Sequence, residues 1–163
     1  MSNALGISVH TGWAACVVVR RSPAKREVLA NQIVHVLTEP ERFCFHRASE
    51  MPIETAAGWL SDLRARALKN ARAELKALLA HDVGMVAVIA RAGEPGELSK
   101  IISSHTRIHA AEGCFYRDLF IEACGVPAQL IAASELDVAR APKLPIKPWG
   151  KDQKLAALAA WRL

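Results

Sequence analysis

The chain has 163 residues, which is long enough for one well-packed core and short for two domains. Hydrophobic residues make up 52% of the chain and charged residues 23%, as in an ordinary globular protein, and the longest apolar runs fall far below membrane-spanning length. The net charge of +5 is compatible with a polyanionic partner such as nucleic acid. We therefore expect a single domain over residues 1–163 that does not cross a membrane.

The N-terminal residues and the cysteines indicate in which cellular compartment the protein is expected. Residues 1–7 lack a basic region followed by an apolar stretch and a cleavage site, so we expect a cytoplasmic location. The four cysteines are widely scattered with no Cys-x-x-Cys pair, which excludes a zinc knuckle and a redox motif. In that compartment they are expected to be buried free thiols. They are Cys16, Cys44, Cys114 and Cys124.

The first part of the chain predicts a three-stranded antiparallel meander. Residues 4–9 and 13–20 are apolar and β-branched runs, and His10-Thr11-Gly12 between them suits a turn. Residues 28–37 form a third strand of the same character.

A connection, a long helix and a buried strand follow. Residues 38–53 contain two prolines and the apolar piece Phe43-Cys44-Phe45, which predict a connection with at most a brief strand. From Glu54 to Ala80, alanines, leucines and alternating charges predict a long helix. Gly84 to Ala90 is almost continuously apolar, which is typical of a strand buried on both faces near the centre of a sheet. The apolar side of the helix comprises Trp59, Leu60, Leu63, Ala67, Leu68, Ala71, Leu75, Leu78 and Leu79.

A second helix, predicted over residues 98–124, carries the most informative polar groups. Helical spacing places His105, His109 and Glu112 on one face, within or beside an apolar stripe. Ionisable groups in such a position need partners. The stripe is formed by Leu98, Ile101, Ile102, Ile108, Phe115, Leu119, Phe120 and Ala123.

The last part of the chain predicts a short strand and a short helix. Residues 128–133 form an apolar strand. The segment 141–150 is too rich in proline for a helix or a central strand, so we expect it to lie extended across the surface. Residues 152–161 predict a final helix with its leucines and Trp161 facing inward.

The resulting order is strand, strand, strand, helix, strand, helix, strand, helix, which is the order found in ribonuclease H-like domains. Gly6-Ile7-Ser8-Val9-His10-Thr11 resembles the Gly-Ile-Asp-x-Gly-Thr opening of bacterial Holliday-junction resolvases, and the segment that starts at Asp152 is similar to their acidic, alanine-rich final helix. The resemblance implies an α/β fold with a mixed sheet, a three-stranded antiparallel meander plus two parallel strands, flanked by helices.

The chain departs from that family where the resemblance implies catalytic carboxylates. In the resolvase-like family, carboxylates near the first strand, the end of the fourth strand and the last helix hold divalent metal ions for phosphodiester hydrolysis. Here the first position is Ser8, the fourth strand runs into Arg91 with Glu94 as the nearest acid, and Asp152 alone suits the third position. A hydroxyl cannot replace a carboxylate as a magnesium ligand without loss of binding energy. Standard two-metal chemistry is therefore not expected, and Asp152 also suits a helix cap.

The histidine helix offers a replacement site, with limits set by its geometry. Along the helix axis, His105 and His109 are about 6 Å apart and His105 and Glu112 about 10 Å. One metal ion therefore needs ligands from another element. Alternatively, the histidines bond with Glu112, Tyr116 or backbone groups and fix how the helix packs. The candidate ligands from elsewhere are Asp152, Glu94 and His10.

Two functions remain open, and the sequence does not identify a cofactor for either of them. The first is a non-nucleolytic module that binds nucleic acid or a protein through its basic surface, and the second is a metal- or histidine-dependent phosphoester hydrolase with its site on the 98–124 helix. A homo-oligomer is a third alternative. Arg107 and Arg117 are expected off the apolar stripe, either solvated or binding an anion. The candidate catalytic residues are His105, His109, Glu112 and Asp152. The candidate ligand-binding residues are Ser8, His10, Thr11, Arg107 and Lys151.

Overall fold

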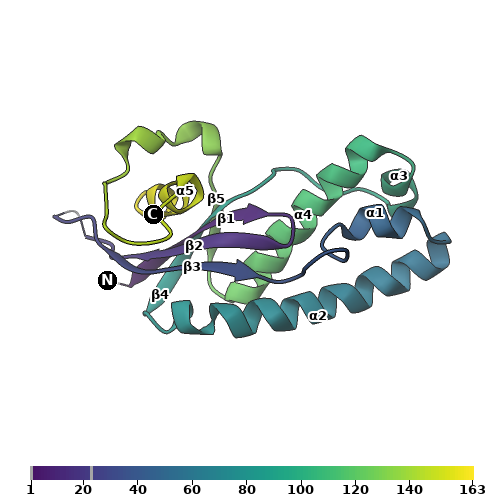
Figure 1. Ribbon diagram of the computed structural model, residues 1–163, viewed down its shortest axis with the longest axis horizontal. Helices are drawn as coiled ribbons and strands as arrows, with labels where there is room; N and C mark the ends of the chain where they lie inside the picture. The colour runs from purple at the N-terminus through teal and green to yellow at the C-terminus, as the bar shows by residue number, and fades with distance from the viewer. Residues whose placement is uncertain (1, 23) are drawn as a thin grey trace.

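The computed structural model describes residues 2–22 and 24–163, and it contains a five-stranded sheet in the order β3-β2-β1-β4-β5 (Figure 1). The first three strands are antiparallel to one another, β4 runs parallel to β1, and β5 runs parallel to β4. The predicted meander with two parallel strands is confirmed. The strands are β1 (Asn3–His10), β2 (Trp13–Val19), β3 (Val28–His35), β4 (Val83–Ile89) and β5 (Ala128–Leu130).

Helices cover both faces of the sheet. The long helices α2 (Ile53–Leu79) and α4 (His105–Cys124) form the main core with one face, and α5 (Lys151–Ala160) packs on the other (Figure 1). The short helices α1 (Cys44–Ser49) and α3 (Leu98–Ile102) lie beside α4. None of the helices in the described ranges is long and apolar enough to cross a membrane.

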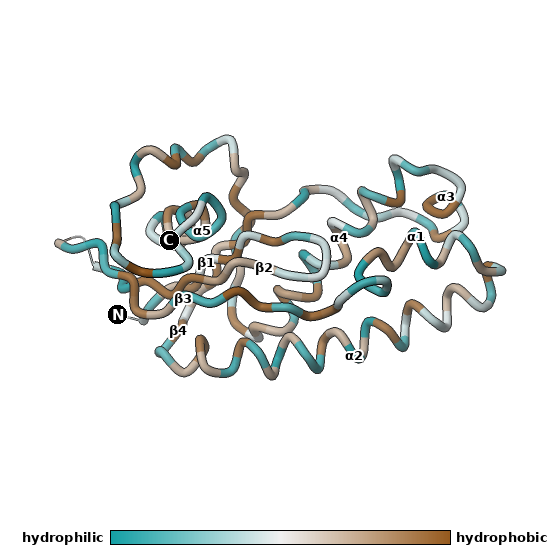
Figure 2. The backbone as a smooth tube through the Cα atoms, viewed as in Figure 1, coloured by the Kyte–Doolittle hydropathy of each residue, from teal (hydrophilic) through white to brown (hydrophobic). Residues whose placement is uncertain are grey.

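The helix α2 follows its predicted pattern closely. It spans Ile53–Leu79, against the predicted residues 54–80. Figure 2 shows hydrophobic and hydrophilic residues alternating along it, as expected for a helix with one face on the core. Its fully or almost fully buried residues are Ala56, Leu63, Ala67, Ala71, Leu75 and Leu78.

The apolar piece around residue 44 is a helix, and the expectation of a brief strand there is wrong. The N-cap residue of α1, Phe43, makes no side-chain cap. Instead, the Glu112 carboxylate of α4 accepts hydrogen bonds from the backbone amides of Phe45 and His46. A carboxylate at free helix amides stabilises a first turn, so a tertiary contact that local sequence does not encode favours the helix.

The predicted helix over residues 98–124 is two helices. The segment α3 ends at Ile102, and Ser104 adopts an extended conformation with φ −144° and ψ 119° before α4 begins at His105. The apolar residues of α3 therefore join the same core as those of α4, but from a separate helix. Because the break places His105 in the first turn of α4, its side chain lies at an exposed helix end.

The last helix is more enclosed than an amphipathic surface helix. Nearly every residue from Gln153 to Ala160 is buried, because the chain after β5 curls around α5 (Figure 1). This segment includes the short 3₁₀ turns η1 (Ala133–Glu135) and η2 (Val138–Arg140), and Trp149 packs against the α5 side of the sheet. The strand predicted over residues 128–133 is shorter and forms an exposed edge.

Close approach of α5 to the sheet depends on Gly6. Alternate residues of β1 face α5, and a Cβ atom added to Gly6 would lie 1.8 Å from the carbonyl oxygen of Ala156. The absence of a side chain at this position lets the helix backbone rest on the strand. The next two residues on the same face of β1 are Ser8 and His10.

The prediction of buried free thiols is confirmed for all four cysteines. Burial raises the pKa of the Cys44 and Cys124 thiols to about 12, and the nearby Glu112 carboxylate adds to the effect at Cys44. Because the thiolate is the reactive form, we expect both thiols to react with a chromogenic disulfide reagent at pH 8 only after denaturation. Complete labelling of the native protein within minutes would contradict this burial.

Candidate functional site

The first candidate cluster lies where β1 ends beneath α5. Ser8 is 4% exposed, and its hydroxyl donates a hydrogen bond of 3.3 Å to Oδ1 of Asp152. Nε2 of His10 lies 2.9 Å from the same oxygen. One carboxylate oxygen of the last helix is thus held by two side chains of the first strand.

The β1–β2 turn holds the ring of His10 in place. His10 pairs with Trp13 across a two-residue turn in which Gly12 has a φ of +86°, a conformation that favours glycine. The rings of His10 and Trp13 stack with centroids 4.1 Å apart and planes inclined by 5°. His10 therefore has a fixed face against Trp13 and a fixed edge against Asp152.

Asp152 does not cap its own helix, although its place near the helix start suits that role. The N-cap of α5 is Gly150, and the Gln153 side chain accepts a hydrogen bond of 2.9 Å from the Gly150 amide. The Asp152 side chain points instead to Ser8 and His10. Among the residues proposed as catalytic from sequence, Asp152 thus belongs to the β1 cluster.

The second cluster consists of three histidines. Nε2 of His105 and Nε2 of His109 are 3.0 Å apart, and both residues are exposed. The ring of His46, from α1, lies 5.2 Å from the His105 ring and 4.8 Å from the His109 ring, measured between centroids. One nitrogen from each of the three residues lies within 4.8 Å of the other two. Of the residues placed within or beside the apolar stripe, His105 and His109 therefore lie on its solvent-exposed side.

Glu112 supports this cluster from the interior. Its side chain is 2% exposed, and Oε1 accepts hydrogen bonds from the backbone amides of Phe45 and His46 at 3.2 and 3.3 Å. Nδ1 of His46 lies 2.9 Å from the same oxygen. Of the alternatives open from the sequence, a contact of Glu112 with His105 or His109 is not found: Glu112 contacts His46 of another helix, and His105 and His109 contact each other.

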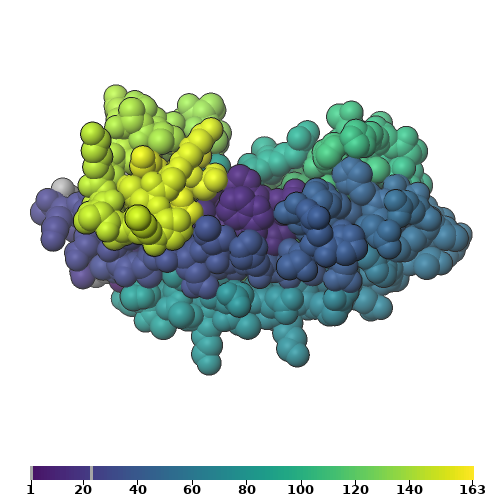
Figure 3. All heavy atoms as spheres, in the orientation of Figure 1, coloured from purple at the N-terminus to yellow at the C-terminus, as the bar shows by residue number. Residues whose placement is uncertain are grey.

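A pocket of about 290 Å³ connects the two clusters. Figure 3 shows the surface hollowed between α5 and the end formed by α1 and α3, with residues near the end of β1 exposed in the hollow. A Cβ atom added to Gly113 would lie 3.2 Å from the Arg91 side chain, so the glycine leaves room for that arginine. The pocket is lined by Val9, His10, Thr11, Ala90, Arg91, His109 and Gly113.

Three other residues considered from sequence lie elsewhere or act differently. Arg107 borders a separate pocket together with Glu94, and Lys151 is exposed at the start of α5. Arg117 is 5% exposed and donates to the carbonyl oxygens of Arg91 and Gly93 at 2.8 and 2.7 Å. The two expectations for Arg117, a solvated side chain or an anion-binding one, are therefore wrong. Its guanidinium instead holds the turn that follows β4.

His46 was missed from the sequence, although it completes the histidine cluster. It lies in a segment read as a connection, and 66 residues separate it from Glu112. The one local signal is a single histidine that follows two phenylalanines in a proline-flanked connection, and this signal does not define a partner.

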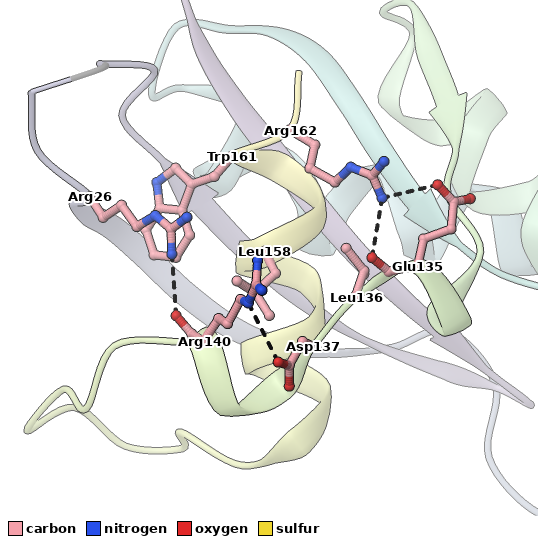
Figure 4. Close-up of a pocket in the computed structure, with 8 residues that line it drawn as sticks. All are labelled: Arg26, Glu135, Leu136, Asp137, Arg140, Leu158, Trp161 and Arg162. Carbon is pink, nitrogen blue, oxygen red and sulfur yellow. Dashed lines mark hydrogen bonds and ion pairs between the residues drawn. The ribbon is translucent and has the colours of Figure 1, made fainter.

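A further pocket, of about 430 Å³, lies between α5 and the chain that curls around it (Figure 4). Two of its three arginines are compensated, because Arg162 pairs with Glu135 and Arg140 pairs with Asp137. The guanidinium of Arg26 lies over the ring of Trp161, 5.4 Å from its centroid. These internal contacts make it a weaker candidate for anion binding than the pocket at the end of β1.

Comparison with known proteins supports the fold assignment. No protein-family model and no curated protein sequence matches the chain. The structure of Thermus thermophilus RuvC in complex with a Holliday junction substrate is similar, with a TM-score of 0.53 and 16% identity over 99% of this chain and 91% of that one. A second Thermus thermophilus RuvC structure gives the same TM-score and identity over 98% and 91%. The chain has a ribonuclease H-like fold, and its similarity to the resolvases is distant.

Proposed function

We propose that the chain is a ribonuclease H-like module that binds nucleic acid in the pocket at the ends of β1 and β4, without two-metal hydrolysis. The observation that carries the proposal is that Arg91 and two histidines line this pocket and that none of its described lining residues is acidic. Ser8 occupies the position on β1 where the resolvase resemblance implies a carboxylate, and Arg91 directly follows the region where β4 ends. A site of this kind favours a phosphate over a divalent cation.

The proposed loss of two-metal chemistry follows from the ligands that magnesium requires. Mg²⁺ binds through charged or strongly polar oxygens in a near-octahedral arrangement. None of the described residues that line the pocket is acidic. Asp152, behind His10, already accepts hydrogen bonds at Oδ1 from Ser8 and His10. A single carboxylate with one oxygen already hydrogen-bonded is a poor substitute for a set of metal-binding carboxylates.

Phosphate binding in the pocket would use groups from three elements. Arg91 is exposed, and Arg117 holds its backbone carbonyl, so the guanidinium extends from a fixed point. His10 of β1 and His109 of α4 also line the pocket. An arginine can bind two phosphate oxygens at once, and the net charge of +5 favours association with a polyanion.

Binding of labelled single-stranded, duplex and branched DNA, measured by fluorescence anisotropy over a salt series, tests this proposal. Affinity should fall steeply with salt because phosphate contacts release counterions. Replacing Arg91 with alanine should weaken binding to every sequence and reduce the salt slope by about 1. The control is Lys76→Ala, an exposed cation in the last turn of α2 that does not line this pocket. Equal effects of the two substitutions, or weak binding to all three DNAs, would refute the proposed site.

A second candidate function is phosphoester hydrolysis at the histidine cluster. It is favoured by one observation, that His109 lines the same pocket as His10 and Arg91. A phosphate held there would lie beside imidazoles that can act as a general base. Hydrolysis of an activated phosphodiester that is lost in His109→Ala and retained in Asp152→Asn would support this candidate. Absence of hydrolysis with added Zn²⁺ or Mn²⁺ would eliminate it.

A further inference from the structure

We propose that His46, His105 and His109 form a binding site for one divalent transition-metal ion of the Zn²⁺ type, with Glu112 as the residue that positions His46. The site is separate from the Ser8–Asp152 cluster at which the fold's carboxylate chemistry would be expected. The inference does not depend on nucleic-acid binding or hydrolysis, because metal binding can be measured alone.

The spacing of the three nitrogens fits one ion. Two imidazole nitrogens at about 2.05 Å from a tetrahedral Zn²⁺ lie about 3.3 Å apart. Nε2 of His105 and Nε2 of His109 are 3.0 Å apart, and the ligand atoms of all three histidines lie within 4.8 Å of one another. The site requires the third nitrogen to approach more closely than this upper limit, by rotation of side chains that are exposed or half-buried.

The two helices provide this arrangement for a simple geometric reason. Residues His105 and His109 are four apart on α4, so their side chains project from the same face. A third ligand must then come from a different element, and α1 provides His46. His105 and Glu112 are too far apart along the helix to bind one ion together. With His46 as the third ligand, Glu112 does not need to contact the ion.

Glu112 gives His46 a defined orientation. With Nδ1 of His46 next to the carboxylate, Nε2 is the nitrogen left for a metal. Carboxylates paired in this way with a metal-binding imidazole fix its tautomer and raise its basicity. Because Glu112 is almost fully buried and is itself held by two backbone amides, the orientation does not depend on a mobile surface group.

The position of the cluster suits an ion with an open coordination site. Three protein ligands plus water are typical of reactive zinc sites, whereas structural sites use four. His105 and His109 are exposed, and His109 also borders the pocket that contains Arg91. An ion held here would lie next to the proposed phosphate position, where its fourth ligand could be water or a phosphate oxygen.

The experiment is a titration of tag-free protein, stripped with chelator, with Co²⁺ followed by visible absorption, and then displacement by Zn²⁺. We expect one ion per chain, displaced stoichiometrically by Zn²⁺. His46→Ala, His105→Ala and His109→Ala should each weaken affinity by at least tenfold. The matched control is His81→Ala, an exposed histidine in the turn before β4, which should bind as the unmodified protein does.

A positioning role for Glu112 is tested by the same titration of Glu112→Gln. We expect a loss of about 10- to 100-fold in metal affinity, as for other residues that orient a metal ligand. Far-UV circular dichroism and metal-free thermal unfolding show whether each variant is folded, and His105→Ala, at an exposed helix start, provides a variant with little structural risk. Failure of the chelator-stripped protein to bind Co²⁺ or Zn²⁺ at one ion per chain, or equal binding by His105→Ala and His81→Ala, would overturn the site.

Discussion

The Gly6→Ala variant is expected to lose about 3 kcal/mol of the free energy of unfolding, which is at the upper end for overpacking a core. The added Cβ would lie 1.8 Å from the carbonyl oxygen and 2.5 Å from the carbonyl carbon of Ala156. These are backbone atoms of α5, so no side-chain rotation can relieve the clash. The helix or the central strand must move.

The same substitution should also disturb the site, because α5 carries Asp152. A displaced helix would separate Asp152 from Ser8 and His10, which hold its carboxylate in the unmodified protein. Urea unfolding measures the stability, and the imidazole signals of His10 in NMR spectra report the local change.

The matched control is Gly58→Ala in α2, where an added Cβ meets no atom within 4 Å. Alanine should stabilise that helix by about 0.5 to 1 kcal/mol. Equal stability of Gly6→Ala and the unmodified protein would show that α5 does not rest on β1 as described.

Replacing Glu112 with alanine is expected to cost about 3 kcal/mol. Its buried carboxylate accepts hydrogen bonds from two backbone amides of α1 and from His46, and hydrogen bonds to a charged group contribute about 1.5 to 3 kcal/mol each before the cost of burying the charge. Without the carboxylate, the first turn of α1 loses its acceptor and a cavity remains. Thermal and urea unfolding measure the loss.

Two further variants separate the contributions to this effect. Glu112→Gln should retain part of the stability, since its amide oxygen can still accept from the two backbone amides. Glu122→Ala, on the exposed side of the same helix, should change stability by less than about 1 kcal/mol because surface ion pairs contribute little. A loss in Glu112→Ala no larger than in Glu122→Ala would mean that Glu112 does not anchor α1.

The sheet could be predicted because its information is local. Apolar and β-branched runs mark the strands, Thr11-Gly12 gives the first turn, and the almost continuous apolar run of β4 indicates a strand covered on both faces. The long α2 was predicted to within one residue at each end, because its apolar positions recur with helical period over seven turns or so. These features need no knowledge of distant partners.

The helices near the histidines could not be predicted in the same way. Residues 98–124 have helical period throughout, yet Ser103 and Ser104 interrupt the helix, and only tertiary packing decides where such a break falls. The helix α1 depends on Glu112, which lies far along the chain. Because the sequence around α1 predicts a connection, it does not place His46 near α4.

The site could be predicted only in part, because helical spacing is local and the contacts between helices are not. Helical spacing correctly places His105, His109 and Glu112 near one another, but it cannot tell which of them faces solvent and which reaches another helix. The structure leaves His105 and His109 exposed and buries Glu112. Asp152 was recognised at the last helix from a resemblance, whereas its contacts with Ser8 and His10 arise from the packing of α5 on β1.

The central claim, nucleic-acid binding without two-metal hydrolysis, is tested most directly by one measurement on a labelled four-way DNA junction. Binding and strand cleavage are followed in the same sample, with Mg²⁺ present, for the unmodified protein and for Asp152→Asn. The account predicts salt-sensitive binding by the unmodified protein with no Mg²⁺-dependent product. Mg²⁺-dependent cleavage that disappears in Asp152→Asn would contradict it, because the fold's carboxylate chemistry would then still operate around that one residue.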